Sequence, residues 1–234
     1  MHNDLITFDI TEDIASLGVR LAVFYISGLS NRTEDSQFES LKTASLDRIR
    51  AGLSPQQIKT DPILQAFRDI HTQIGFSNRD YVAASESLLN YLHKNGVLPR
   101  VNLLVDIYNL VSIETRLALG AHDISRVSGS IHLRRTSGDE IFWPLGSDQP
   151  KPSRTGGYAY IDDSNEVICM LEVRQVQKSK ATLDTRDCFY IIQGNARTSF
   201  NDLQQAARRL SELTRQFCGG EEHGFFMGGY NVPF

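Results

Sequence analysis

The stretch that decides the fold runs from Pro99 to Ser112 and reads Pro-Arg-Val-Asn-Leu-Leu-Val-Asp-Ile-Tyr-Asn-Leu-Val-Ser. It predicts a helix over residues 102–115, because apolar side chains recur at helical spacing at Leu103, Ile107, Leu110 and Val111. A polar stripe, formed by Asn102, Asp106 and Asn109, runs along the same helix. The stripe faces either solvent or a cleft. The apolar surroundings of Asp106 favour a cleft, since a buried carboxylate has to be paired or hydrogen-bonded.

Most of the sequence before this helix has helix-forming patterns, and most of the sequence after it has strand patterns. Before it lie a buried strand over residues 19–27, ended by Gly28, and helical segments over residues 38–50, 55–74 and 82–95. After it come short strands over residues 130–135, 140–143, 158–161, 167–173 and 188–193, and an amphipathic helix over residues 201–217. We therefore expect an α+β fold with a mostly antiparallel sheet. Residues 1–234 should form a single domain that contains residues 38–95 as a helical insertion.

Composition narrows the class of protein. The chain has 234 residues, of which 41% are hydrophobic and 22% charged, which favours a folded protein with a sizeable core. The net charge of -4 argues against binding a nucleic acid with the whole surface, so any RNA contact should be a local basic patch. Acidic residues near the start speak against a signal peptide, and Leu21–Ile26 is too short to span a bilayer. We expect a cytoplasmic protein without membrane or DNA partners.

The sequence contains none of the common catalytic motifs, which leaves a few polar candidates. The three cysteines are far apart, so we expect buried thiols and no metal or other cofactor. His122, between Ala121 and Asp123, is either catalytic or a solvated turn residue. A denser polar cluster comprises Glu172, Arg174, Gln175, Lys178, Lys180, Thr182 and Asp187. In a strand, Glu172 and Arg174 would project to the same face, where they form either part of a site or a surface ion pair.

Several short motifs resemble, in their order and spacing, the B3/B4 domain. This domain is the editing module of the phenylalanyl-tRNA synthetase β chain and also occurs as free-standing proteins. The motifs are Gly28-Leu29-Ser30-Asn31, Ser85-Glu86-Ser87-Leu88-Leu89, Pro99, Asn102, Val105-Asp106-Ile107-Tyr108-Asn109, Gly120, Asp123, Gly129, Asp162-Asp163, Cys169, Arg174-Gln175, Thr185-Arg186-Asp187 and Gly194. The chain departs from the family pattern in two places. Leu171-Glu172-Val173 stands where relatives often carry Trp-Asn-Trp, and Ala84 replaces a usual proline.

The resemblance implies an editing hydrolase that acts in trans. Editing domains of this family hydrolyse the ester between a wrong amino acid and the 3′ end of a tRNA, which clears products that a synthetase cannot reject by binding alone. Because the ester is already activated, such an enzyme needs a positioned water and a stabilised oxyanion rather than a covalent nucleophile. The resemblance therefore implies a deacylase of mischarged aminoacyl-tRNA.

The substitution at Glu172 bears on the substrate. It removes aromatic bulk, which argues against a phenylalanine- or tyrosine-type side chain, and it adds a carboxylate that can accept paired N–H donors from a guanidino group. Arginyl-tRNA synthetases generally lack an editing domain, so an arginine analogue such as canavanine on tRNA(Arg) is a candidate substrate. The alternatives are tyrosyl-tRNA(Phe), a non-catalytic module that binds an amino acid or tRNA, and a hydrolase of free small esters or amides.

These inferences assign roles to residues. The expected catalytic residues are Asp106, Asn109, Glu172 and His122. The expected substrate-binding residues are Arg174, Gln175, Lys180 and Asp187. The expected tRNA-binding residues are Lys178, Arg134, Arg135, Arg208 and Arg215.

Overall fold

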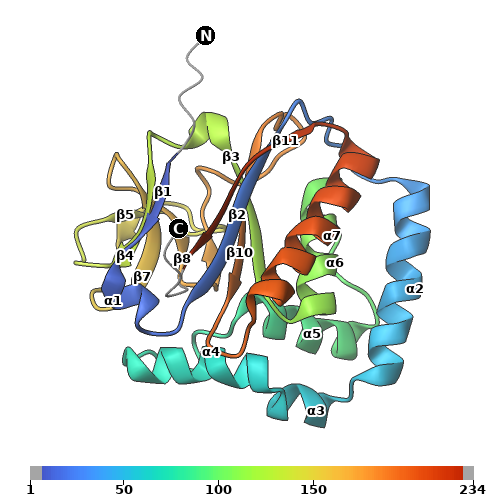
Figure 1. Cartoon of the computed structure of the whole chain (residues 1–234), viewed down its shortest axis with the longest axis horizontal. Helices are drawn as coiled ribbons and strands as arrows, with labels where there is room; N and C mark the ends of the chain where they lie inside the picture. Colours follow the sequence, from blue (N-terminus) through green and yellow to red (C-terminus); the bar gives the residue numbers. More distant parts are fainter. Residues whose placement is uncertain (1–6, 229–234) are drawn as a thin grey trace.

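Two β-sheets and a layer of helices stack face to face (Figure 1). The computed structural model describes residues 7–228. Its central sheet has the strand order β11-β2-β10-β3 and is antiparallel throughout. These strands are β2 (Arg20–Ser27), β3 (Ala118–Asp123), β10 (Cys188–Gly194) and β11 (Glu221–Gly228).

The outer sheet has the order β1-β4-β7-β8-β9, and only the β1–β4 pair is parallel. Its strands are β1 (Phe8–Ile10), β4 (Ile131–Arg135), β7 (Tyr158–Asp162), β8 (Val167–Met170) and β9 (Arg174–Gln175). A separate two-stranded ribbon pairs β5 (Ile141–Phe142) with β6 (Lys151–Pro152). The predicted α+β class and mostly antiparallel pairing are confirmed.

The helices cover the other face of the central sheet (Figure 1). They are α2 (Ser36–Gly52), α3 (Pro55–Thr60), α4 (Pro62–Gln73), α5 (Ala84–Asn95), α6 (Leu103–Thr115) and α7 (Phe200–Cys218), with the short α1 (Glu12–Ala15) and η1 (Ile124–Arg126) elsewhere. Local sequence sets their ends. Asn102 caps α6 by accepting the Val105 N–H, and Gly96 ends α5 in the left-handed region at φ 77°.

The central sheet is buried on both faces, so the molecule has two main cores. Ala22, Phe24 and Ile26 of β2 point to the helices, whereas Leu21 and Val23 point to the outer sheet. Helix α4 reaches both cores, because its Leu64 belongs to the first and its Ile70 to the second. The segment expected as a helical insertion therefore packs into the same cores as the sheets.

The helical segment expected over residues 55–74 forms two helices, because Asp61 caps a new helix at Pro62, where the sequence allows one to begin. Two local expectations needed correction. The strand expected over residues 140–143 is limited to Ile141–Phe142, which pairs with β6, while β4 pairs with β1 and β7. The strand expected over residues 167–173 stops at Met170, because Leu171 adopts a left-handed φ of 53°.

Candidate functional site

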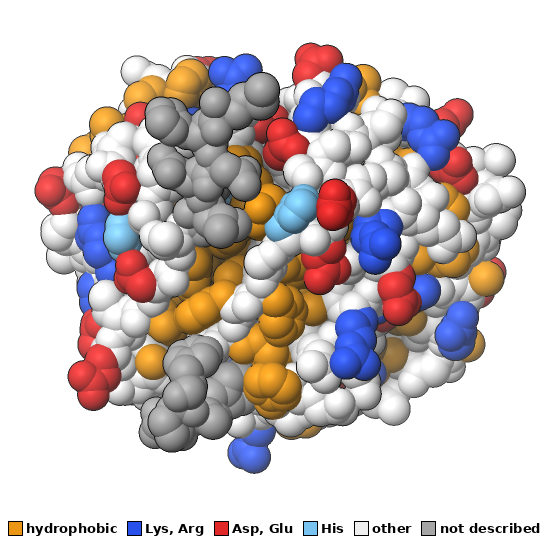
Figure 2. All heavy atoms as spheres, turned by 45° about the horizontal axis from the view of Figure 1, so that its top comes forward, with side chains coloured by type: hydrophobic (Ala, Val, Ile, Leu, Met, Phe, Trp, Pro, Cys, Tyr) orange, Lys and Arg blue, Asp and Glu red, His pale blue; other side chains and the backbone are white. Residues whose placement is uncertain are grey.

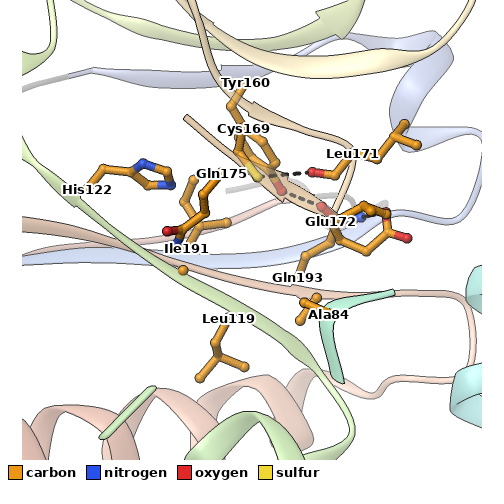
Figure 3. A pocket seen from close by; sticks show the side chains of 13 residues that line it. Ala84, Leu119, His122, Tyr160, Cys169, Leu171, Glu172, Gln175, Ile191 and Gln193 are labelled. Atoms are coloured by element: carbon orange, nitrogen blue, oxygen red, sulfur yellow. Dashed lines mark hydrogen bonds between the residues drawn. The ribbon is translucent and has the colours of Figure 1, made fainter. Parts of the chain in front are cut away.

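An inner pocket opens where the edges of the two sheets meet (Figure 3). It has a volume of about 40 Å³ and lies between β3 and β10 of the central sheet and the β7–β9 region of the outer sheet. Its lining residues are Ala84, Ala118, Leu119, Gly120, His122, Tyr160, Cys169, Leu171, Glu172, Val173, Gln175, Ile191 and Gln193.

The inner pocket continues into a larger outer groove of about 480 Å³. Both are lined by Ala84, Leu119, Val173 and Gln175, which form the neck between them. The outer groove is completed by Asp80, Val82, Ser87, Leu88, Tyr108, Asn109, Pro144, Leu145 and Arg174. The combined cleft is large enough for a small organic ligand.

Glu172 lies at the pocket wall inside a buried hydrogen-bond network. One carboxylate oxygen, Oε1, is 2.5 Å from Nε2 of His71 on α4. The other, Oε2, accepts the Tyr158 hydroxyl at 2.5 Å and the Gln193 amide at 3.2 Å. The Gln193 Oε1 in turn accepts the Tyr160 hydroxyl at 2.6 Å. The network therefore holds a carboxylate at a fixed place in the protein interior.

The left-handed Leu171 explains why Glu172 is buried. Because Leu171 ends β8, Glu172 lies in the turn between β8 and β9 rather than in a strand. Glu172 is 5% exposed, whereas Arg174 is exposed in β9. The expectation that the two side chains share one strand face is therefore wrong, and no surface ion pair forms between them.

His71 is the counter-group of Glu172. Burial lowers the pKa of His71, but the hydrogen bond and negative charge of Glu172 outweigh this effect and leave the pKa above 6.5. Its Nδ1 is 3.1 Å from the Tyr81 carbonyl, which an N–H at that position can satisfy. His71 can therefore carry a proton and balance the buried carboxylate.

His122 lies in β3, so it is not the solvated turn residue that the sequence left as an alternative. Its Nδ1 is 2.9 Å from the Ser179 hydroxyl, and its buried Nε2 has no hydrogen-bond partner within residues 7–228. Burial lowers the pKa of His122 to about 4, so the imidazole is neutral at pH 7. A neutral ring nitrogen thus faces the inner pocket without a protein partner (Figure 3).

Gly120 leaves room for the neck of the cleft. A Cβ added there would lie 2.9 Å from the Gln175 amide nitrogen and 3.5 Å from Nε2 of His122. Gln175 is further held by the buried Tyr108, whose hydroxyl donates to its Oε1 at 3.4 Å. Its amide is therefore held at the boundary between pocket and groove.

Cys169 also lines the inner pocket. Burial raises the pKa of its thiol to about 12, so it stays protonated at pH 7. Its Sγ donates to the Leu171 carbonyl at 3.3 Å. A thiolate nucleophile is thus disfavoured at this position.

The three residues of the polar stripe on α6 lie in different surroundings. Asn109 lines the outer groove. Asp106 instead points to α2, where it pairs with Lys42 at 3.1 Å and accepts the Val101 N–H at 3.0 Å. Asn102 caps the helix. The structure therefore brings Asn109 to the cleft and leaves Asp106 in a buried ion pair outside both pockets.

Of the four residues expected to bind substrate, two lie in the cleft and two lie outside it. Arg174 and Gln175 line the outer groove. Lys180 is exposed and donates to the Gln177 side chain at 3.0 Å, although its backbone pairs with His122. Asp187 accepts the Gly28 N–H at 3.0 Å and fixes the turn after β2. Lys180 and Asp187 line neither the inner pocket nor the outer groove.

Three of the five residues expected to bind tRNA are neutralised by carboxylates. Lys178 pairs with Asp162 and Glu166, Arg134 with Glu140, and Arg135 with Asp13. Arg208 and Arg215 are exposed on α7. On the face shown in Figure 2, basic side chains alternate with acidic ones rather than gather into one patch.

Sequence reasoning missed His71, Tyr158 and Gln193. The available signal was weak: His71 follows Phe67 by one helical turn, on the apolar face of a helix. Nothing in the sequence links it to Glu172, which lies 101 residues away.

Metal-binding clusters and membrane-spanning helices are both absent from the part of the chain that the structure describes. Within residues 7–228, no group of three or more histidine, cysteine or acidic side chains could hold a metal ion. None of the helices in this range combines the length and the apolar character that crossing a bilayer requires.

Comparisons with known proteins place the fold. The chain resembles the crystal structure of an N-terminal fragment of the phenylalanyl-tRNA synthetase β-subunit from Pyrococcus horikoshii, with a TM-score of 0.51 and 13% sequence identity. The alignment covers 93% of this chain but 50% of the fragment, so the chain spans half the fragment's length, and the likeness shows the fold alone. No curated protein sequence matches. A family model described as the B3/4 domain matches residues 74–219. The chain therefore belongs to the B3/4 domain family, as its sequence motifs predicted.

Proposed function

We propose that this protein is an ester hydrolase that deacylates mischarged aminoacyl-tRNA in trans. Two comparisons support a tRNA-related role: membership of the B3/4 family, and the fold shared with a fragment of a tRNA synthetase subunit. The chemistry is argued from the cleft itself.

One observation carries the proposal: the unpartnered Nε2 of His122 faces an inner pocket that opens into a ligand-sized groove. A cavity needs roughly 10–15 Å³ of free space to hold a water, so the inner pocket, at about 40 Å³, has room for an ordered water molecule. With Nδ1 donating to Ser179, Nε2 presents a lone pair that accepts a hydrogen bond from this water. The attacking water is thus oriented at the end of the groove.

The scissile ester belongs at the neck. The Gln175 amide can donate to the ester carbonyl there and stabilise the oxyanion that forms when water attacks. Nε2 of His122 takes the proton of the attacking water and returns it to the ribose oxygen as the ester C–O bond breaks, which releases the free amino acid and the deacylated tRNA. The adenosine occupies the outer groove, where Asn109 and Arg174 offer polar contacts, and the amino acid extends from the neck toward Glu172 at the wall of the inner pocket. Asp106 does not contact the substrate in this arrangement, because it pairs with Lys42 outside both the inner pocket and the outer groove.

The proposed substrate is an arginine analogue such as canavanine on tRNA(Arg). A carboxylate has about four acceptor sites, and three protein donors use three of those on Glu172. The remaining site can accept one N–H from the substrate's side chain or its α-amino group. Asp80 adds a second carboxylate to the groove.

A non-catalytic binding module remains the rival function, and one observation favours it. Both oxygens of Glu172 are already hydrogen-bonded, so this carboxylate is not free to act as a general base. In that case the cleft would retain an aminoacyl end without hydrolysing it.

A panel of charged tRNAs tests the proposal. The protein should shorten the ester half-life of canavanyl-tRNA(Arg) and leave arginyl-tRNA(Arg) and phenylalanyl-tRNA(Phe) largely intact, and His122→Asn should abolish the effect. Turnover of tyrosyl-tRNA(Phe) alone would overturn the proposed side chain. Unchanged half-lives at high protein concentration would favour the binding module, and hydrolysis of small esters without tRNA would indicate a metabolic hydrolase.

A further inference from the structure

We propose that the unpaired 3′ end of the tRNA lies in a second groove, lined by Lys151, Arg154 and Arg174, which leads to the outer groove. This inference rests on the proposed function, because it identifies the path by which the substrate reaches the cleft. It replaces the basic patch expected from the sequence with a different set of cations.

The second groove has a volume of about 450 Å³ and adjoins the outer groove. Asp80, Pro144 and Arg174 line both. A strand whose terminal nucleotide lies in the outer groove would therefore continue directly into the second groove. The ribbon of β5 and β6 forms part of its wall through Phe142, Lys151 and Pro152.

The cations of the second groove are free to meet phosphates. Within residues 7–228, none of Lys151, Arg154 and Arg174 has a carboxylate within ion-pair distance, and all three are exposed. Lys178, by contrast, is already shared between Asp162 and Glu166. A phosphate would thus gain a new partner in the second groove, whereas at Lys178 it would have to displace carboxylates.

Aromatic rings hold two of these cations in place. The Arg154 guanidinium lies 4.1 Å from the centre of the Phe76 ring and donates to the Gly75 carbonyl at 3.1 Å. Lys151 Nζ lies 5.9 Å from the centre of the Phe142 ring. Because both rings are buried, they act as supports that hold the two cations in the groove wall, where the charges can meet phosphates of a single strand.

Asp80 fixes the direction of the strand. Among the described residues that line the outer and second grooves, Asp80 is the single acidic one, and it lies where the two grooves join. Its carboxylate repels phosphate but can accept a ribose hydroxyl or a cationic group, which suits the sugar and aminoacyl end rather than the backbone. The phosphates then belong on the Lys151 and Arg154 side.

A binding experiment with two RNAs tests this path. The probes are intact deacylated tRNA(Arg) and the same tRNA trimmed of its unpaired 3′ nucleotides. The protein variants are the wild type, Lys151→Glu/Arg154→Gln, and the single variant Lys151→Glu, which removes only the cation beside the Phe142 ring. Lys59→Glu, an exposed residue of α3 outside all these grooves, is the matched charge control. Circular dichroism melts check that each variant is folded.

We expect trimming to weaken binding by the wild type and by Lys59→Glu but to have little effect on the double variant. The salt dependence of intact tRNA binding should also fall, with a log–log slope smaller by about 0.7 for each phosphate that the variant no longer neutralises. An equal loss of affinity for both RNAs would place these cations against another part of the tRNA and overturn the proposal, as would no loss at all. Neither readout requires hydrolysis, so the proposed binding of the 3′ end in the second groove is tested independently of the deacylation assay.

Discussion

The imidazole of His71 and the carboxylate of Glu172 lie 2.5 Å apart at the wall of the inner pocket, although one comes from α4 and the other from the turn after β8. Both side chains are 1% exposed, so the pair is shielded from solvent. This contact ties the helical layer to the outer sheet and places a compensated charge inside the site.

Removing the Glu172 carboxylate should cost stability as well as activity. Glu172→Ala would leave His71, Tyr158 and Gln193 without their acceptor, and breaking a buried pair costs about 3–5 kcal/mol of unfolding free energy. Glu172→Gln keeps the shape and one acceptor, so it should fold better while losing the carboxylate that accepts the substrate's N–H. Thermal melts and deacylation rates, with the exposed Glu212→Ala as control, measure both effects. An alanine variant as stable as the wild type would contradict the network.

The stabilising effect of His71 should depend on pH. Its pKa in the folded state lies above the ordinary value of 6.5, so the folded state binds the proton more tightly than the unfolded state does. The stabilisation is fully present below about pH 6.5 and is lost as the pH rises through the folded-state pKa. The difference in unfolding free energy between wild type and His71→Gln, from urea denaturation, should be larger at acidic than at alkaline pH. A constant difference would show that His71 contributes only by packing.

His122 should behave in the opposite way. Its folded-state pKa of about 4 lies below 6.5, so the unfolded state takes up the proton first and stability falls as the pH drops through this window. The difference of two to three pKa units corresponds to roughly 3 kcal/mol in unfolding free energy. His122→Asn retains a polar group near Ser179 and should remove this pH-dependent loss. Urea denaturation from pH 7 to pH 4 provides the comparison, and identical slopes for the two proteins would contradict the assignment.

Gly120→Ala should close the neck of the cleft while leaving the fold intact. The new methyl group would meet the Gln175 amide at 2.9 Å, and the far end of that side chain can move, so the conflict falls on the site rather than the backbone. We expect at least a tenfold drop in deacylation rate, equivalent to about 1.4 kcal/mol, with little change in melting temperature. Gly52→Ala, at a position with no neighbour within 4 Å of the added Cβ, is the control. Full activity in Gly120→Ala would remove the neck from the reaction path.

Local features of the fold could be predicted from the sequence because short-range chemistry determines them. Asn102 and Gly96 mark helix ends by their own hydrogen bonding and backbone freedom. The apolar run of β2 indicates a strand buried on both faces. Strand partners depend on distant segments, so the pairing of β4 with β7, and not with β5, had no local signal.

The candidate site was harder to predict because burial and distant contacts decide it. The carboxylates of Asp106 and Glu172 look alike in sequence, but Lys42 neutralises the first outside the cleft and the second lies at the pocket wall. The position of Glu172 depends on the backbone of Leu171, which adopts a conformation that leucine rarely takes. Charge alone was also a poor guide to tRNA-binding residues, because the charge of Lys178 is already balanced by Asp162 and Glu166.

The reach of α4 across both cores has a consequence for how this protein can change during evolution. Because α4 delivers His71 to Glu172, an acidic residue at position 172 is tolerable only with a proton-bearing partner from that helix. Replacing either residue alone with one that cannot hydrogen-bond leaves the other buried without its partner. Positions 71 and 172 should therefore covary among relatives, and a change of substrate preference at the pocket should require a compensating change in a helix that never touches the substrate.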